Sequence, residues 1–404
     1  MKPRRPTVHI ADLPVIHVET RAHLEQVAHH LRRTTRLAFD TEFLRETQYR
    51  PQLELIQLAT DDLLVIVDYR AVPTLEPLLD VLLDPSTLKV VHAARQDLET
   101  IYHLTRRVPT PLFDTQVAAA LVGLGAQAGY ATLVEHLLGI QLPKSQTLTN
   151  WAHRPLTEAQ VAYALDDVRY LLPLHDELGR RLEVTGRSTW FAEEMERLAS
   201  PSLYAPVAPE EAWRQVRGAS ALSPKELAIL QAVAAWRERV AREHNRALPL
   251  ILRDSALIAI AKQRPRSKQA LRRLRGIHRW TLTHFSDELL DIIREASHTP
   301  RDHRPQRAAC GYPPLNEDEM ALLALLRTWV RLRAEEMHVA PTALADEHDL
   351  RELLRAHRQG THDSLPLLRG WRREAVGDEL IAILKGRAAL RWDDYQRRFT
   401  LEPS

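Results

Sequence analysis

The sequence predicts an α/β domain with a mixed sheet flanked by helices, followed by two small all-α domains, on three observations. Over the first 180 or so residues, β-branched runs alternate with stretches of helical spacing. From Asp114 onward the pattern is almost entirely helical. Two proline-rich segments then divide the helical part into blocks. Strands that alternate with helices and then give way to helices are typical of this architecture.

Length and composition set limits on the prediction. The chain has 404 residues, of which 45% are hydrophobic, so two or three domains can each bury a core. The single cysteine, Cys310, argues against an internal disulfide and a cysteine-based zinc site, and it fits a reducing, cytoplasmic setting. Residues 1–18 contain no apolar stretch of signal-peptide length, and no later run is long and apolar enough to span a bilayer, so we expect no membrane association.

Charge is unevenly distributed along the chain. Residues 1–200 hold 21 Lys and Arg against 26 Asp and Glu, whereas the remaining residues hold 34 against 27. The acidic first half suits a cation site, and the basic second half suits a polyanionic partner.

The expected elements of the first domain follow from these patterns. Strands are expected at 15–18, 37–40, 53–60, 63–68 and 90–92, and helices at 21–31, 75–83 and 97–104. We therefore assign residues 1–200 to the α/β domain.

Two segments rich in proline and small residues, 201–223 and 297–314, are expected to be linkers, the first of them partly ordered. They separate helical blocks at 224–296 and 315–396, and 397–404 is left as a tail. The blocks share a pattern, because Trp236 and Trp329 each precede a proline-containing segment that is followed by Asp and Leu. This indicates an internal repeat of roughly 80–90 residues.

Asp40 and Glu42 form the first candidate site, at the end of an apolar strand. Strand alternation places both carboxylates on one side of the strand, where they can converge. Two such charges repel unless a cation neutralises them. Alone, the pair is better explained as an ordinary acidic turn.

Two further candidates lie on helices. Asp97 falls in the first turn of a helix that follows a buried strand, where compensation of the helix dipole is the simpler explanation. Tyr163 and Asp167 are four residues apart and share one helix face, whereas Asp166 is rotated about 100° away and is expected to face solvent. A Tyr and an Asp that merely pack or cap would look the same.

Taken together and in this order, Asp40, Glu42, Asp97, Tyr163 and Asp167 resemble the three exonuclease motifs of the DEDDy superfamily. The resemblance covers residues 37–178, and ribonuclease D is the best match. It is carried by the segments DTEFLRETQYRPQLELIQL, VVHAARQDLE, FDTQVAAALVG, GYATLVEHLLGIQLPKSQT and NWAHRPLTEAQVAYALDDVRYLLPL. The sequence departs from the family pattern at Asn150 and Asp166, neither of which is a motif residue.

The resemblance implies a ribonuclease H-like exonuclease domain that binds two divalent metal ions and hydrolyses RNA from the 3′ end to nucleoside 5′-monophosphates. Hard carboxylate oxygens suit Mg²⁺ or Mn²⁺ better than zinc. In the family pattern Asp40, Glu42 and Asp167 are shared between the two ions, Asp97 reaches the second, and Tyr163 orients the attacking water. A phenol, whose pKa is near 10, is a poor base at neutral pH. Phe43 could stack on the terminal bases or simply pack on the sheet.

The helical blocks resemble helicase-and-ribonuclease-D C-terminal (HRDC) domains, the second block being a more diverged copy. Residues 261–280 carry eight Lys and Arg and no acid, so the stretch can contact RNA phosphates or form a solvated helix face. The cations proposed to contact RNA are Lys262, Arg264, Arg266, Lys268, Arg272, Arg273 and Arg275.

The implied partners are RNA, namely tRNA precursors and other small structured RNAs, with no obligate protein partner evident. Two alternatives remain open. One is a DNA exonuclease of the same superfamily, which the sequence does not distinguish. The other is a non-catalytic RNA-binding or scaffold protein, against which the presence of all four carboxylates and Tyr163 argues.

Overall fold

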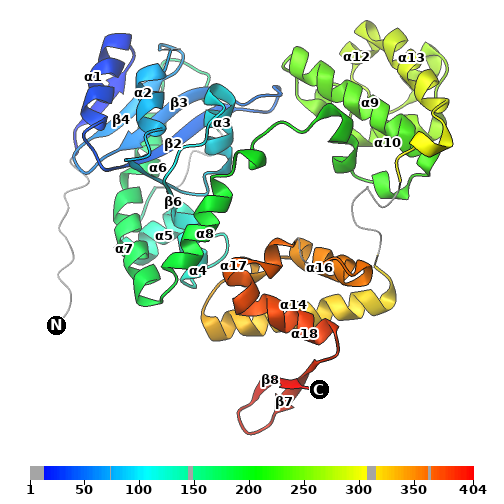
Figure 1. Ribbon diagram of the computed structural model, residues 1–404. Helices are drawn as coiled ribbons and strands as arrows, with labels where there is room; N and C mark the ends of the chain where they lie inside the picture. The colour runs from blue at the N-terminus through cyan, green and yellow to red at the C-terminus, as the bar shows by residue number, and fades with distance from the viewer. Residues whose placement is uncertain (1–12, 73, 144–148, 307–314, 363–364) are drawn as a thin grey trace. The chain divides into compact units, whose positions relative to one another are not determined.

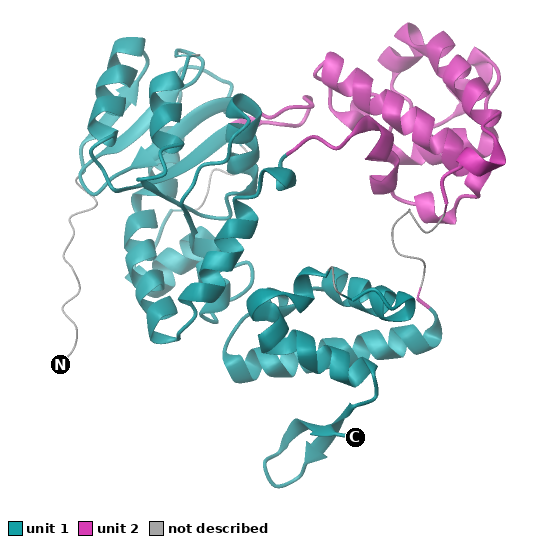
Figure 2. Cartoon of the chain, viewed as in Figure 1, with its two compact units in different colours: residues 1–42, 53–204, 316–404 teal, residues 43–52, 205–315 magenta. Residues whose placement is uncertain are grey.

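The computed structural model describes residues 13–72, 74–143, 149–306, 315–362 and 365–404, which form two compact units (Figures 1 and 2). Unit 1 comprises residues up to Glu42, Leu53–Tyr204 and Asn316–Ser404, and unit 2 comprises Phe43–Gln52 and Ala205–Leu315. Cys310, residues 144–147 of the family segments and the end of the predicted linker 297–314 lie outside the described residues. No helix among the described residues is long and apolar enough to cross a membrane.

A six-stranded mixed sheet forms the centre of the first domain (Figure 1). The strand order is β1-β4-β3-β2-β5-β6, with β1 parallel to β4, β4 antiparallel to β3, and β2, β5 and β6 parallel. The strands are β1 (Val15–Val18), β2 (Arg36–Leu44), β3 (Gln52–Ala59), β4 (Leu64–Asp68), β5 (Leu88–Val91) and β6 (Leu112–Asp114). The five predicted strands are therefore present, and β6 is an addition.

Helices flank the sheet, as predicted. They are α1 (Arg21–Leu31), α2 (Glu76–Leu82), α3 (Arg95–Thr105), α4 (Thr115–Leu121), α5 (Tyr130–Leu133), α6 (Glu158–Arg169), α7 (Leu171–Val184) and α8 (Ser188–Leu198). Both faces of β3 and β4 are buried, which explains why β4 is a nearly continuous apolar run. In β3 the polar residues Glu54 and Gln57 are buried as well.

Unit 2 is a helical bundle built around α9. Its helices are α9 (Pro224–Glu243), α10 (Asp254–Gln263), α11 (Lys268–Arg273), α12 (Arg279–His284) and α13 (Ser286–Ser297). Part of the predicted linker 201–223 belongs to this bundle, since Pro209–Gln215 and Ala219–Ala221 form 3-10 turns. Trp213 of the first turn is buried in the same core as Trp236. Because proline and alanine are common in both linkers and tight turns, composition alone did not reveal this packing.

The loop from Phe43 to Gln52, between β2 and β3, also packs in unit 2. The Tyr49 hydroxyl donates a hydrogen bond to the Glu238 carboxylate of α9 and accepts one from Nε of Arg242 at 3.1 Å. The amide of Ala247 donates to the Thr47 carbonyl at 3.1 Å. This loop is therefore part of unit 2, where α9 and the residues that follow it hold it.

The C-terminal part of unit 1 is a second helical bundle that ends in a β-hairpin. Its helices are α14 (Glu317–Met337), α15 (Pro341–Leu344), α16 (Glu347–Gln359), α17 (Gly370–Arg372) and α18 (Asp378–Leu384). The prediction that 315–396 is helical and 397–404 a tail is wrong at its end, because Ala388–Asp393 (β7) and Arg398–Pro403 (β8) pair as antiparallel strands. Their apolar residues alternate with polar ones, which is the period of a strand.

The C-terminal bundle packs on α4 and α8 of the first domain. Nη1 of the buried Arg187 donates to the carbonyls of Leu121 at 2.5 Å and His338 at 3.1 Å, and Nη2 donates to that of Met337. The rings of Trp190 and Trp371 stack with centroids 4.7 Å apart. The two parts of unit 1 are therefore joined by a buried polar contact as well as by aromatic packing.

Gly123 is required for this close approach. Its φ is +81°, and a methyl group there would lie 2.6 Å from the carbonyl oxygen of His338. We expect Gly123→Ala to lower the free energy of unfolding by about 2–3 kcal/mol, combining left-handed strain with a steric clash. Urea unfolding measures this loss. Gly125→Ala is the control, because Gly125 also has a positive φ but has nothing within 4 Å of the added methyl. Equal losses for the two variants would contradict the close approach.

Candidate active site

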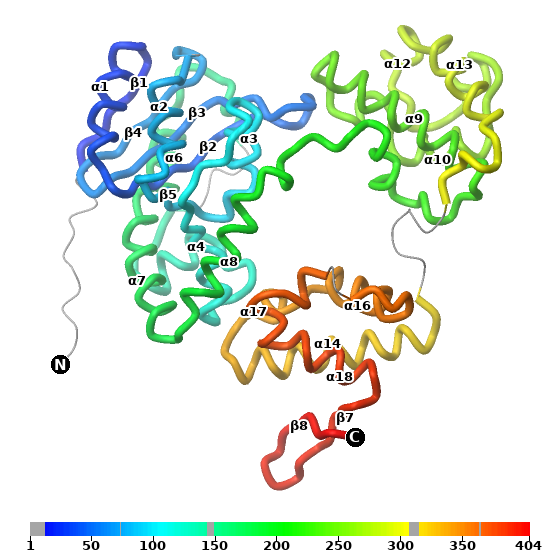
Figure 3. Tube along the Cα trace, viewed as in Figure 1, coloured from blue at the N-terminus to red at the C-terminus, as the bar shows by residue number. Residues whose placement is uncertain are grey.

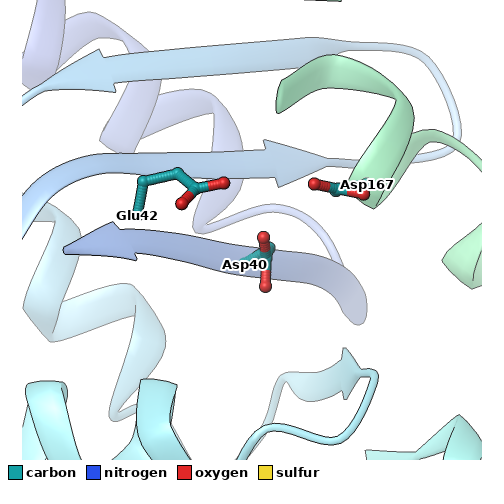
Figure 4. Close-up of side chains that lie close together, drawn as sticks. All are labelled: Asp40, Glu42 and Asp167. Carbon is teal, nitrogen blue, oxygen red and sulfur yellow. The ribbon is translucent and has the colours of Figure 1, made fainter. Parts of the chain in front are cut away.

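Asp40, Glu42 and Asp167 lie together in unit 1 (Figure 4). One carboxylate oxygen from each lies within 4.8 Å of the others. Asp40 and Glu42 come from the end of β2, where Leu37, Ala38 and Phe39 are buried and fix the strand. Asp167 comes from α6, which begins at a capping box in which Thr157 and Gln160 bond each other. A strand end and a helix face thus meet at one point.

Asp97 lies outside this group of three and is buried in the first turn of α3. Its Oδ1 accepts a hydrogen bond from the Thr41 amide at 3.1 Å and another from the Thr41 hydroxyl. Since Thr41 stands between Asp40 and Glu42, the fourth carboxylate is bonded to the strand that carries the first two.

All four carboxyl groups hold their protons unusually tightly in the metal-free protein. Burial, followed by repulsion from Asp97, Asp167 and Glu42, raises the pKa of Asp40 well above its usual range. Burial and the charge of Asp167 raise the pKa of Glu42 to about 8. Burial raises the pKa of Asp167 to about 7, and burial raises that of Asp97 to about 6. The site therefore needs protons or cations to balance its charge.

Stability should consequently depend on pH and metal together. Folded Glu42 keeps its proton up to about pH 8, whereas the unfolded chain releases it near 4.5, so the folded state binds more protons in this window. Stability in chelator should therefore fall as pH rises from about 5 to about 8. A bound divalent ion replaces the protons, so Mg²⁺ should raise the melting temperature more at about pH 8 than at about pH 5.5.

Thermal unfolding with EDTA or with Mg²⁺ at both pH values tests this dependence. The control is Glu42→Gln, which cannot ionise and should show a shallower fall in EDTA. A variant that follows the wild-type pH profile would contradict the assignment of the effect to this carboxyl group.

Tyr163 donates a hydrogen bond from its hydroxyl to Asp167, one helical turn further along α6. Burial and the charge of Asp167 raise the pKa of Tyr163 above its usual range. Its proton is therefore retained at neutral pH, and its chemistry is that of a hydrogen-bond donor. The ring also lies near the buried Trp151, with centroids 6.1 Å apart.

Asp166 does not point freely into solvent, in contrast to our expectation. Its side chain is largely covered and forms an ion pair with Nε of Arg169 at 3.0 Å. Its carbonyl accepts a hydrogen bond from the Tyr130 hydroxyl at 2.7 Å, and that hydroxyl in turn accepts one from the Tyr170 amide at 3.1 Å. Tyr130 thus holds the end of α6 where Asp167 stands, a role that spacing in the sequence did not indicate.

Asp114 is the N-cap of α4 and also accepts hydrogen bonds from the turn before α3. Its carboxylate accepts from the amides of Gln116 and Val117 at the start of α4, at 2.8 and 3.3 Å. It also accepts from Ala93 and Ala94 at 3.1 and 3.0 Å. Ala93 has a φ of +52°, and α3 has no side-chain cap of its own. One carboxylate therefore caps two helices and holds the turn that precedes Asp97.

The predicted RNA-contacting residues are placed in unit 2. Phe43 is half-buried at the end of β2, next to Glu42. Lys262, Arg266, Arg272, Arg273 and Arg275 are exposed on and around α10 and α11, and Arg264 is half-buried. Lys268 is exposed but pairs with Asp287 at 2.7 Å. Two of the seven cations are thus less available than the others.

Comparisons with known proteins identify related domains and chains. A family model described as 3′-5′ exonuclease matches residues 15–183, and the HRDC domain model matches 226–293. The chain is 38% identical over 359 residues to ribonuclease D of Bartonella henselae, covering 88% of this chain and 87% of that one. It is 39% identical to ribonuclease D of Gluconacetobacter diazotrophicus, covering 93% and 94%.

A solved structure shows the same architecture. The crystal structure of Escherichia coli RNase D, described as an exoribonuclease involved in structured RNA processing, matches with a TM-score of 0.84. Sequence identity is 32%, and the match covers 93% of this chain and 99% of that one.

Proposed function

Because the chain belongs to the ribonuclease D family and is therefore a 3′→5′ exoribonuclease, we propose that it trims the 3′ ends of small structured RNAs, tRNA precursors among them. We propose that it uses two divalent metal ions, Mg²⁺ or Mn²⁺, and releases nucleoside 5′-monophosphates. The observation that supports metal-dependent hydrolysis is that Asp40, Glu42 and Asp167 each place a carboxylate oxygen within 4.8 Å of the others.

The donor set fits divalent ions of this kind. The three converging groups offer hard carboxylate oxygens, which Mg²⁺ and Mn²⁺ prefer. Their raised pKa values indicate a site whose charge is unbalanced when it holds neither protons nor cations. Bound there, the ions would supply a polarised water and neutralise charge on the scissile phosphate.

The residues of the chain then have distinct tasks. Asp40, Glu42 and Asp167 would hold the ions, while Asp97, bonded to Thr41, fixes the strand end and completes the negative site. Tyr163 keeps its proton and would orient the attacking water by hydrogen bonding. Phe43, half-buried beside Glu42, would stack on the terminal bases.

The helical blocks would supply affinity for structured RNA. We propose that the exposed cations around α10 and α11 bind phosphates without reading sequence. We also propose that the C-terminal bundle is a diverged second HRDC domain. In its favour, α9 and α14 each begin at a capping box and bury a tryptophan, Trp236 and Trp329.

A triple replacement tests the phosphate contacts. Arg272→Ala, Arg273→Ala and Arg275→Ala together should weaken tRNA binding and lower the slope of log affinity against log salt by about 3, roughly one per contact. Cleavage of a trinucleotide should be unchanged. The control variant carries Arg21→Ala, Arg32→Ala and Arg180→Ala. It removes the same number of positive charges, but these three arginines pair with acids on unit 1. An unchanged salt slope in the first triple variant would refute the contacts.

One assay tests the proposed function as a whole. The wild-type chain is incubated with 5′-labelled single-stranded RNA, the matching DNA, or a tRNA with a 3′ extension, each in Mg²⁺, Mn²⁺ or EDTA. A ladder that shortens from the 3′ end only with metal, and that extends to the tRNA, is the expected result. Equal degradation of DNA would favour a DNA exonuclease, and no degradation would favour a non-catalytic RNA-binding protein.

A further inference from the structure

The chain ends in a β-hairpin with several exposed aromatic side chains. In the C-terminal hairpin, residues 388–403, β7 and β8 pair in register from Ala388–Pro403 to Asp393–Arg398. Figure 3 shows it running out from the end of α18. Asp393 closes the turn by accepting from the amides of Tyr395 and Gln396, both at 2.9 Å. A two-stranded hairpin is marginally stable in water unless something covers it.

One face of the hairpin is apolar. Alternation and register place Leu390, Trp392, Phe399 and Leu401 on the same side. The rings of Trp392 and Phe399 lie edge to face with centroids 5.1 Å apart. Nevertheless Trp392 is 48% exposed and Phe399 is 42% exposed, while Tyr395 in the turn is 96% exposed. Grouped exposed aromatic residues indicate a binding surface rather than part of a core.

The charges around these rings favour an anionic partner. Residues 385–404 contain five Lys and Arg against three acids. Each acid is engaged within the hairpin: Asp393 by the turn amides, Asp394 by the Trp392 indole N–H at 2.7 Å, and Glu402 by Arg391 at 3.0 Å. Arg397 and Arg398 are exposed beside Tyr395 and Phe399. Arg391 is paired with Glu402, so the other four Lys and Arg of residues 385–404 outnumber the two remaining acids, Asp393 and Asp394.

We propose that the C-terminal hairpin is a binding surface for single-stranded RNA, on which bases stack against Trp392, Tyr395 and Phe399 while Arg397 and Arg398 contact phosphates. Aromatic rings interleaved with arginine are the combination that single-stranded nucleic acids require. A second copy of the chain would cover the rings but would leave these exposed arginines without a complement. The inference rests on the proposed action on RNA and adds a site built from other residues than the carboxylates and the cations of α11.

Binding is measured by fluorescence anisotropy with full-length protein that carries Asp40→Asn, so that the probe is not cleaved. The probe is 5′-fluorescein oligoadenylate of about 16 nucleotides, the upper end of single-strand site sizes. Trp392→Ala, Tyr395→Ala and Phe399→Ala together should weaken binding at least about tenfold, given the usual contribution of stacking per base. Met320→Ala is the control, because Met320 is 50% exposed on α14 of the same bundle. It should bind as the parent does.

A second variant separates loss of RNA contacts from local misfolding of the hairpin. Arg397→Glu with Arg398→Glu leaves the apolar face intact and should also weaken binding, with a smaller salt dependence than the parent. Affinity within twofold of the parent for both variants overturns the proposal. So does a dimer, seen by sedimentation, that the aromatic variant loses while RNA affinity stays unchanged.

Failure of the proposed function is distinguishable from failure of the hairpin site. Wild-type protein that does not shorten a trinucleotide in metal contradicts the nuclease assignment. Wild-type protein that does so, with hairpin variants that bind the long probe normally, contradicts only the hairpin site.

Discussion

Asp40→Asn and Asp167→Asn should each reduce RNA hydrolysis by more than about 10³-fold, since each weakens the binding of the divalent ions that would neutralise charge on the reacting phosphate. Asparagine keeps the shape of the side chain but removes the negative charge needed to hold a divalent ion. Both residues belong to the group whose oxygens lie within 4.8 Å of one another. Shortening of 5′-labelled RNA in Mg²⁺ measures the loss, and anisotropy in EDTA should show that RNA binding remains.

The adjacent residue provides a matched control. Asp166→Asn removes the same charge one position away, but Asp166 pairs with Arg169 and lies outside the group of three. It should retain activity within a few-fold of wild type. Near-normal turnover for Asp40→Asn, or an equal loss for Asp166→Asn, would show that the ion-binding assignment is wrong.

Asp114→Ala should cost about 3–5 kcal/mol of folding free energy, because four amides lose a buried acceptor. Asp114→Asn should cost less, about 1–2 kcal/mol, since its oxygen can still accept from Ala93, Gln116 and Val117 while its NH₂ faces the Ala94 amide. Urea unfolding gives both values. Activity should fall as well, since the turn before Asp97 loses its support.

An ordinary helix cap sets the scale for this prediction. Thr20 caps α1 through a single acceptor to the His23 amide at 3.3 Å, so Thr20→Ala should cost about 1 kcal/mol. If Asp114→Ala costs no more than Thr20→Ala, Asp114 is not a cap shared between two helices. Partial recovery of activity in raised Mn²⁺ would further tie the loss to displacement of Asp97.

Much of the candidate site is predictable from the sequence, because the repeat of a strand or helix determines which side each side chain faces. Alternation along β2 put Asp40 and Glu42 on one side, and the spacing of four put Tyr163 and Asp167 on one helix face. The supporting contacts were not predictable in this way. Thr41 with Asp97, and Asp114 with Ala93, join residues far apart in sequence, so no local pattern reveals them.

In the fold too, features set by a local sequence pattern are predictable, whereas features set by contacts between distant residues are not. The structure contains the helices and strands whose apolar period is clear, whereas the three residues of β6 carry too little alternation to predict a strand. The packing of residues 209–221 into unit 2 depends on Trp213 meeting a distant core, and composition made that segment resemble a linker. The β7 and β8 strands lie in a stretch for which the sequence predicts a helix up to residue 396 and then a tail.

The buried contacts of Arg187 have a consequence for synthesis of the chain on the ribosome. The guanidinium bonds the carbonyl of His338, which is made 151 residues later. During that interval the first domain has left the ribosome, but Arg187 lacks two of its three carbonyl acceptors, those of Met337 and His338. Domains generally fold as they are synthesised. Here the surface of the first domain around Arg187 can be covered only after the C-terminal bundle has been synthesised. A prematurely terminated chain therefore leaves this surface exposed to proteases and chaperones.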